Sequence, residues 1–371
     1  MERSNLRPAG PAYLFSALVL AAVTGACGDA PSEPAPSSES AGTAEPGVVR
    51  APASTVTAAA TVTYRGVNLN GPDFGSALPG THGVDYVFPD ASDVDYFVGK
   101  RMNTFRVAFR WERLQRNARR TFDAAYSKEL ATLVKTVTAR NGYVVLNPQN
   151  FARYYGNVIG SSAVPNAVFA DLWKRLAQQY KSNPRVLFGL MNEPNTMPTE
   201  QWVSAAKAAV SAIRSTGARN VILVPGNGWS GAHSWNDDWY GTPNAVALLG
   251  ISDPANNLLF EAHQYLDSDS SGQSDTCVSS TIGRERLAPF VAWLRANRRR
   301  GFIGELAGGR NATCYEAIAD MVGYITSQSD VLVGWTWWAA GPWWPASYPF
   351  TLEPLDGIDR PQMNVLSPFL P

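Results

Sequence analysis

The amino-acid sequence predicts an α/β fold in which eight parallel strands close into a (β/α)8 barrel, also called a TIM barrel. Short runs rich in β-branched and aromatic residues alternate with amphipathic stretches of helical periodicity, and this alternation is typical of parallel βαβ units. Eight such units in roughly 300 residues suit one closed barrel. No glycine-rich dinucleotide loop follows an early strand, which disfavours the runner-up, an open doubly wound sheet.

The N-terminus has the pattern of a secretory signal peptide, which we expect over residues 1–27. Arginines precede an apolar run at 12–23, and small residues and Cys27 follow it. The run is shorter than the about 20 residues that span a bilayer, so export is expected. A cysteine directly after small residues also resembles a bacterial lipoprotein signal, although Thr24 stands where an aliphatic residue is usual. Lipid attachment at Cys27 and plain cleavage with release both stay open.

A linker is expected over residues 28–60. This stretch consists mainly of Pro, Ser, Ala and Thr, with no aromatic residue and no apolar periodicity. Such a composition cannot bury enough apolar surface to offset the entropy lost on ordering, so we expect disorder there. No repeat and no second linker follow, and a single catalytic domain is expected over 61–371.

Inside this domain the strands are expected where apolar, β-rich runs occur, and the helices where apolar residues recur with a period near 3.6. The expected strands are Tyr64–Leu69, Thr104–Phe109, Tyr143–Leu146, Val186–Met191, Val221–Val224, Leu258–His263, Gly301–Glu305 and Val331–Trp337. The longer expected helices are Asp123–Arg140, Ala167–Tyr180, Thr199–Thr216, Arg284–Arg299 and Tyr315–Ser327.

Composition restricts the class of partner. The 31 basic and 31 acidic residues give a formal net charge of zero, whereas a nucleic-acid or anionic-membrane partner would require a basic excess. Membrane attachment is therefore expected only through a lipid on Cys27. The chain has 12 Trp, 14 Tyr and 15 Phe, and these rings either fill the core or offer flat surfaces on which sugars stack. We expect a monomer that acts on a neutral substrate without a cofactor.

Polar residues gather where the strands end, which is where a barrel carries its chemistry. Glu193 and Glu305 each end a mostly apolar strand, so they should converge across the barrel mouth. Two carboxyl groups in different environments are what glycosidic cleavage needs, because one protonates the leaving oxygen while the other attacks or activates water. The other polar and aromatic residues in or after the strands include Arg106, Gln149, Asn150, Asn192, His263, Tyr265 and Trp338.

Several segments resemble glycoside hydrolase family 5. They are GLMNEPN around Glu193, FEAHQYLDSDSSG at 260–272 and IGELAGG at 303–309. YRGVNLNGPDFG, MNTFRVAF and NPQNFARYYG are similar to the first three strand segments of the branch that includes fungal endoglucanase II. The resemblance runs in order from about Tyr64 to the C-terminus, and it implies a retaining endo-β-1,4-glucanase that cleaves internal bonds of cellulose or related β-glucans.

Carried over residue by residue, the resemblance implies that Glu193 is the acid/base and Glu305 the nucleophile. Asn192 would bind the sugar 2-hydroxyl, and His263 and Tyr265 would position the carboxylates and the sugar.

Arg106 would keep the nucleophile ionised, Trp338 would stack under the sugar at the cleavage point, and Gln149 and Asn150 would line a subsite. The chain has three cysteines. Export allows the two within the domain, Cys277 and Cys314, to pair, and the matching cysteines of this branch do pair.

The chain also departs from the family pattern. Gln149 stands where the family has a histidine, and an amide does not titrate near neutral pH. Gly304 and Leu306 replace threonines on either side of the nucleophile, so a polar brace is expected to be missing there. Asp267 and a neighbouring aspartate lack a complete ligand set, and no metal is expected.

Two alternatives remain at this point. A related hydrolase would act on mannan, xyloglucan or mixed-linkage glucan. Loop shapes at the cleft ends would decide between these substrates, and also between endo and exo action, which stays open here. A non-catalytic carbohydrate-binding protein would keep the cleft but would not need both glutamates.

Overall fold

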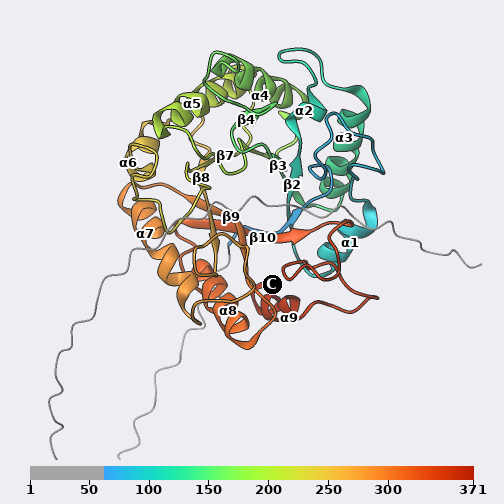
Figure 1. The fold of residues 1–371 in the computed structure, drawn as a ribbon, viewed down its shortest axis with the longest axis vertical. Helices are drawn as coiled ribbons and strands as arrows, with labels where there is room; N and C mark the ends of the chain where they lie inside the picture. The colour runs from blue at the N-terminus through green and yellow to red at the C-terminus, as the bar shows by residue number, and fades with distance from the viewer. Residues whose placement is uncertain (1–61) are drawn as a thin grey trace, which may run out of the picture. The chain divides into compact units, whose positions relative to one another are not determined.

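The computed structural model describes residues 62–371, which form a closed barrel of eight parallel strands surrounded by helices (Figure 1). The strands follow one another around the barrel in the order β1-β10-β9-β8-β7-β6-β3-β2. The predicted (β/α)8 fold is therefore confirmed. The predictions of a signal peptide, a linker and a lipidated Cys27 fall on residues 1–61 and lie outside the described residues.

Every predicted strand is present, and the differences lie at the strand ends. The prediction placed 190–191 in a strand, but β6 ends at Gly189, and β8 continues two residues past His263. A short antiparallel pair, β4 (Arg153–Tyr154) and β5 (Asn157–Val158), was not predicted. The barrel strands are β1 (Tyr64–Leu69), β2 (Thr104–Phe109), β3 (Tyr143–Pro148), β6 (Val186–Gly189), β7 (Ile222–Pro225), β8 (Leu258–Tyr265), β9 (Gly301–Ala307) and β10 (Leu332–Ala340).

The five long predicted helices are present, and shorter ones were missed. One of these begins after Asp90, whose side chain accepts hydrogen bonds from the first turn and forms a capping box with Asp93. Another helix starts earlier than predicted because the Asn311 side chain accepts from the Cys314 N–H. The α-helices are α1 (Ala91–Gly99), α2 (Trp111–Leu114), α3 (Ala124–Ala139), α4 (Asn166–Tyr180), α5 (Thr199–Ser215), α6 (Asn244–Ala247), α7 (Ile282–Ala296), α8 (Ala312–Ser327) and α9 (Pro361–Leu366).

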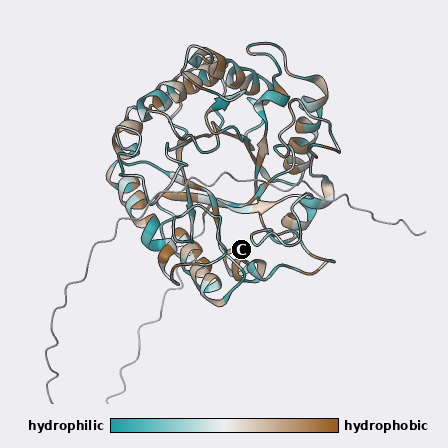
Figure 2. Ribbon diagram, viewed as in Figure 1, coloured by the Kyte–Doolittle hydropathy of each residue, from teal (hydrophilic) through white to brown (hydrophobic). Residues whose placement is uncertain are grey.

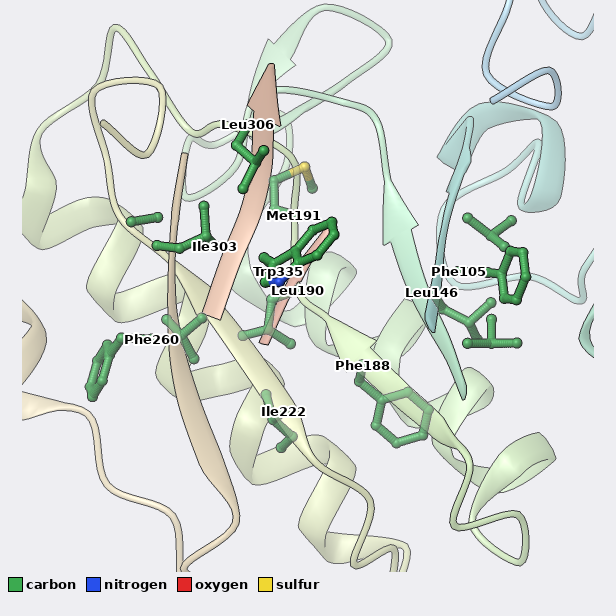
Figure 3. Close-up of a cluster of buried hydrophobic side chains, with 14 of the residues drawn as sticks. Phe105, Leu146, Phe188, Leu190, Met191, Ile222, Phe260, Ile303, Leu306 and Trp335 are labelled. Atoms are coloured by element: carbon green, nitrogen blue, oxygen red, sulfur yellow. The ribbon is translucent and has the colours of Figure 1, made fainter. Parts of the chain in front are cut away.

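Alternate residues of the strands face the helices. Phe188 packs with Trp173 of α4 at a ring-centroid distance of 5.6 Å, and Phe260 packs with Trp293 of α7 at 5.0 Å. These phenylalanines belong to the apolar layer drawn in Figure 3. The outer helices carry both hydrophilic and hydrophobic residues (Figure 2), as expected for amphipathic helices that cover a barrel.

The other set of strand residues fills the barrel interior. A separate apolar cluster consists of Val145, Leu187, Leu223, Leu259 and Phe302. Pairing between neighbouring strands sets Arg106 beside Val145 and Glu261 beside Phe302. Residues paired side by side point to the same face, so these two charged side chains also point into the interior. The floor of the barrel is thus apolar, and buried charge lies toward the carboxyl ends of the strands.

Two links outside the sheet hold loops at this end of the barrel. Cys277, after β8, and Cys314, in the first turn of α8, form a disulfide with their Cα atoms 5.2 Å apart. The indole N–H of Trp337 in β10 donates to the Phe350 carbonyl at 2.8 Å, which ties the segment after β10 to the strand. Within 62–371, no helix has both the length and the apolar character needed to cross a bilayer.

Candidate active site

Glu193 and Glu305 meet at the carboxyl ends of the strands. Glu305 lies in β9, and Glu193 follows β6. One ligand-type atom from each of Glu193, His263 and Glu305 lies within 4.8 Å of the other two. Glu193 has a φ of 42°, a left-handed conformation that is strained for a residue with a Cβ and is often found at functional sites.

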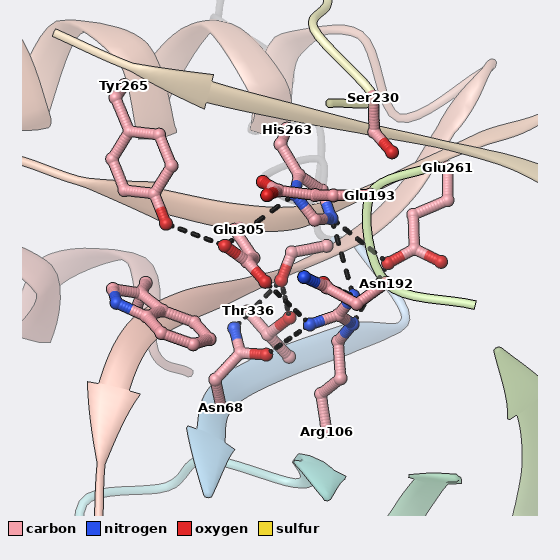
Figure 4. A network of polar contacts seen from close by, with 12 residues as sticks. Asn68, Arg106, Asn192, Glu193, Ser230, Glu261, His263, Tyr265, Glu305 and Thr336 are labelled. Atoms are coloured by element: carbon pink, nitrogen blue, oxygen red, sulfur yellow. Dashed lines mark hydrogen bonds and ion pairs between the residues drawn. The ribbon is translucent and has the colours of Figure 1, made fainter. Parts of the chain in front are cut away.

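Arg106 is the centre of the buried network around these glutamates (Figure 4). Its side chain is fully buried. One terminal nitrogen, Nη1, donates to Glu305 Oε1 at 2.9 Å and to Asn68 Oδ1 at 2.7 Å. The other, Nη2, donates to Asn192 Oδ1 at 2.9 Å. The planar guanidinium therefore fixes three side chains at once, from β1, from β9 and from the segment after β6.

Glu305 has a donor on each carboxylate oxygen. Arg106 donates to Oε1, and the Tyr265 hydroxyl donates to Oε2 at 2.6 Å. Burial raises the pKa of Tyr265 well above its usual range, and the negative charge of Glu305 adds to this effect. The phenol therefore keeps its proton and donates it. The opposite charge of Arg106 and these two hydrogen bonds hold the Glu305 carboxylate in a fixed orientation.

Glu193 is in a different electrostatic environment. Burial raises its pKa, and repulsion from the Glu305 carboxylate raises it further, while hydrogen bonding and charge at His263 oppose the shift. The net direction is upward, so its surroundings favour the protonated form of the Glu193 carboxyl group. Two carboxyl groups in such different environments are suited to different tasks.

His263 lies between the carboxylates. Its Nδ1 is 2.7 Å from Glu193 Oε1 and 3.6 Å from Glu305 Oε2. Burial alone would lower the pKa of this imidazole, but Glu305, Glu193 and Glu261 outweigh that effect and raise the pKa to about 9. His263 is therefore positively charged at neutral pH.

Sequence reasoning missed several residues of the network. Glu261 is fully buried, and its Oε1 is 2.9 Å from Arg106 Nε. Asn68 binds Arg106 and also donates to the Gly304 carbonyl at 2.8 Å. The usable signal for Glu261 was the period of two along β8, since Glu261, His263 and Tyr265 share the inward face. We found no comparable signal for Asn68.

The residues after β3 lie at the edge of the network. Gln149 Oε1 accepts from Asn147 Nδ2 at 2.8 Å, and Asn147 Oδ1 in turn accepts from Arg106 at 3.2 Å. The Asn150 side chain is instead bound to α2, because it accepts from the Trp111 N–H at 2.9 Å and donates to a carboxylate of the same helix. Its amide is thus engaged away from the two glutamates.

Trp338 is half-buried in β10, and a second aromatic layer holds it in place. Its indole N–H donates to the Tyr348 hydroxyl at 2.9 Å, and Trp344 stacks on Tyr348 with ring centroids 4.2 Å apart. Two other tryptophans are clearly exposed, Trp229 at 45% and Trp239 at 56%. Half of the tryptophans are fully buried. The tryptophan rings of this chain are therefore divided between the core and the surface.

The cluster of Glu193, His263 and Glu305 also has the ligand types of a metal site. Its atoms already contact protein donors, and the Arg106 guanidinium 2.9 Å from Glu305 would repel a cation. Asp267 accepts from the backbone N–H groups of 272 and 273 at 3.1 and 3.0 Å, so its oxygens support the loop after β8. The geometry suits proton transfer better than metal binding.

Comparison with known proteins identifies the family. The family model described as cellulase (glycosyl hydrolase family 5) matches residues 61–341. Endo-β-1,4-glucanase B of Aspergillus niger is 42% identical over 296 residues, which cover 79% of this chain and 85% of the relative. Endoglucanase gh5-1 of Neurospora crassa is 39% identical, with coverage of 84% of this chain and 77% of the relative.

Solved structures of endoglucanases are also similar to this chain in sequence and fold. The crystal structure of an endo-β-1,4-glucanase from Xanthomonas axonopodis pv. citri is 48% identical, has a TM-score of 0.82, and covers 83% of this chain and 98% of its own. Endoglucanase Cel5A of Pseudomonas stutzeri in complex with cellobiose is 32% identical, with a TM-score of 0.77 and coverage of 83% of this chain and 92% of its own. The chain therefore belongs to the cellulase family of glycoside hydrolases, glycosyl hydrolase family 5.

Proposed function

We propose that residues 62–371 are an endo-β-1,4-glucanase that hydrolyses internal bonds of cellulose or related β-glucans with retention of anomeric configuration. The observation that carries the proposal is the approach of the Glu193 and Glu305 oxygens to within 4.8 Å. Retaining enzymes keep their carboxyl groups about 5–5.5 Å apart, whereas inverting enzymes need about 6.5–9.5 Å to admit a water molecule.

In the first step Glu305 attacks the anomeric carbon. A bond forms between its carboxylate oxygen and that carbon, the bond to the leaving sugar breaks, and the Glu193 proton passes to the leaving oxygen. Tyr265 and Arg106 hold the attacking carboxylate in one orientation, which reduces the motion needed to reach the transition state.

The second step follows from the change in charge. An ester at Glu305 carries no negative charge, so the repulsion that raises the pKa of Glu193 is lost. Glu193 is then a carboxylate beside the charged His263, and it accepts a proton from water as the water attacks the anomeric carbon. The ester bond breaks, and both glutamates return to their starting states.

Other residues of the network are proposed to bind the sugar. Asn192 is held by Arg106 beside Glu193, which supports contact with the 2-hydroxyl at the cleavage point. Trp338 has a fixed ring and supports stacking under the same sugar. Gln149 and Asn150 remain proposed subsite residues, and the bonds of Asn150 to α2 favour an indirect contribution through loop shape.

The names of the relatives support the substrate class. Several are endo-β-1,4-glucanases, and the solved structure of XacCel5A, 48% identical to this chain with a TM-score of 0.82 and coverage of 83% of this chain and 99% of its own, is a complex with cellopentaose. A β-1,4-glucan is therefore the first substrate to test.

The direct test compares reducing-sugar release and viscosity on carboxymethylcellulose. An endo-acting glucanase lowers viscosity well before many reducing ends appear. The same assays on mannan, xyloglucan and mixed-linkage glucan identify the preferred polymer, and proton NMR of early products shows whether the β-anomer forms first. Early α-anomer would contradict retention, and binding of polysaccharide without any hydrolysis would indicate a carbohydrate-binding protein.

We further propose that the enzyme is an exported monomer. The test for lipid attachment is fractionation of cells that express the chain with Cys27 or with Cys27→Ala. Membrane-associated enzyme that becomes soluble in the variant supports a lipid anchor, and soluble enzyme in both supports cleavage and release. Retention of both forms in the cytoplasm would contradict export.

A further inference from the structure

Glu261 is a third buried carboxylate beside the two proposed catalytic glutamates, and the proposed mechanism gives it no task. It lies two residues before His263 on the inward face of β8. Its Oε1 is 2.9 Å from Arg106 Nε and 3.3 Å from His263 Nε2. Hydrogen bonding and charge at these two groups lower its pKa, although burial alone would raise it, so Glu261 is an anion.

The space that Glu261 occupies exists because residue 304 is glycine. A Cβ at Gly304 would lie 2.0 Å from Glu261 Oε1 and 2.9 Å from His263 Nε2. Any side chain there would force the carboxylate away from the imidazole. The position where a threonine brace was expected to be missing is thus filled by a charged oxygen from the neighbouring strand.

The contacts of His263 Nε2 indicate whether this nitrogen carries a proton. Arg106 Nη2 lies 3.4 Å from this nitrogen and can only donate, whereas the Glu261 carboxylate can only accept. If Nε2 lacked a proton, it would face a donor on one side and an anion on the other. With a proton on Nε2, the ring donates to Glu261, and Nδ1 remains available for Glu193 at 2.7 Å.

We propose that Glu261 is a positioning residue that anchors both Arg106 and His263 and holds His263 as an imidazolium, with one N–H donated to Glu261 and the other to Glu193. The inference deepens the proposed hydrolase function and rests on it for its catalytic meaning. Glu261 touches neither substrate nor reacting atoms. It acts through the histidine that contacts the acid/base.

The charges around His263 agree with this role. The charged or titratable groups that face it are Glu193, Glu305, Glu261 and Arg106, from four different strands or strand ends. Two cations, Arg106 and His263, balance two anions, Glu261 and Glu305. Glu193 is then neutral, as an acid catalyst must be. Without the Glu261 charge, the cluster has an excess of positive charge and releases protons more readily.

The first experiment measures the protonation of His263 in the wild-type protein. The chain has three histidines, and nitrogen-15 NMR distinguishes imidazolium from either neutral tautomer. His82→Gln and His233→Gln assign the signals by elimination. We expect one imidazole to stay doubly protonated at pH 7 and to titrate near pH 9. If the His263 signal is that of a neutral ring at pH 7, the inference is overturned, whatever the variants do.

The second experiment replaces Glu261 with Gln, which keeps the shape and removes the charge. We expect the His263 titration to move downward by about one pH unit or more, since a charge at this distance in a buried site shifts a pKa by that order. The alkaline limb of the kcat/KM profile should move in the same direction, because Glu193 also loses its proton more easily. Unchanged positions of both would overturn the inference.

Asp253→Asn is the matched control. Asp253 is also a buried carboxylate paired with an arginine, 2.7 Å from Arg214, but it precedes β8 at the opposite end of the barrel. This variant should lower the melting temperature and leave the pH profile in place.

The failure of the proposed function and the failure of this inference can be told apart. An enzyme that hydrolyses no glucan would contradict the proposed function but not the NMR result. A neutral His263 in an active enzyme would remove only the role of Glu261.

Discussion

The Tyr265 hydroxyl donates to Glu305 Oε2 at 2.6 Å, on the oxygen that Arg106 does not bind. The two donors come from different strands, β8 and β2, so the carboxylate is held from both sides. The proposed nucleophile, Glu305, therefore has a defined orientation before substrate arrives. Removal of either donor should affect the chemical step more than substrate binding.

Tyr265→Phe tests this arrangement. The variant loses one hydrogen bond to a charged group, which contributes about 1.5–3 kcal/mol. We expect kcat to fall by roughly 10- to 100-fold, with little change in KM. Tyr324→Phe, on the outer helix α8, is the control and should match wild type. A change in KM alone would mean that Tyr265 binds sugar and does not orient the nucleophile.

Glu193→Gln should separate the two steps of the reaction. An amide cannot protonate the leaving oxygen, so hydrolysis of carboxymethylcellulose should fall by a factor on the order of 10³ or more. An aryl cellobioside with an acidic phenol needs little protonation, and its first turnover should be affected far less. Burst kinetics on the aryl substrate measure that turnover. Equal losses on both substrates would argue against Glu193 as the acid.

Glu305→Gln should change the pKa of Glu193 as well as abolish attack. Burial still raises that pKa, but the repulsion from the Glu305 carboxylate is gone, so the Glu193 pKa should decrease. The proton is held below the pKa and lost above it, and deprotonation of the acid therefore occurs at lower pH in the variant. Carbon-13 NMR of the labelled carboxyl groups measures the shift. An unchanged or higher value would contradict the proposed charge coupling.

Gln149→His should alter activity by less than about tenfold, or roughly 1.4 kcal/mol. Gln149 reaches Arg106 only through Asn147, which makes a subsite adjustment the expected role. The kcat/KM of both proteins against pH on one soluble glucan is the measurement. An imidazolium that acted directly on the glutamates would lower the acid/base pKa and move the profile downward, with a change beyond tenfold.

Cys277→Ser with Cys314→Ser removes the disulfide. The bond closes a loop with a sequence separation of 37 residues, and a loop of that size contributes about 2–4 kcal/mol to stability. We expect a lower melting temperature with near wild-type kcat at 25 °C, because neither sulfur contacts the glutamates. Thermal unfolding with and without reductant checks this. A melting temperature insensitive to the reductant in wild type would contradict it.

The strands and the two glutamates could be predicted from the sequence because a local apolar run and a place at the end of that run identify them. Most barrel strands are mainly apolar, and Glu193 and Glu305 stand out because each interrupts or follows an apolar run with a charge. Glu261 interrupts β8 in the same way, but its partners Arg106 and Gly304 come from other strands, and their proximity depends on barrel closure. The amide of Asn150 similarly bonds to α2, a contact that no local pattern encodes.

The contacts of β10 with the segment that follows it bear on how the domain can be trimmed. The family match ends at residue 341, yet the indole N–H groups of Trp337 and Trp338 are satisfied by Phe350 and Tyr348. A fragment cut at the end of the match would leave a buried donor without a partner and the proposed sugar-stacking ring without its support. A minimal active domain should therefore extend well beyond residue 341, where the family match ends.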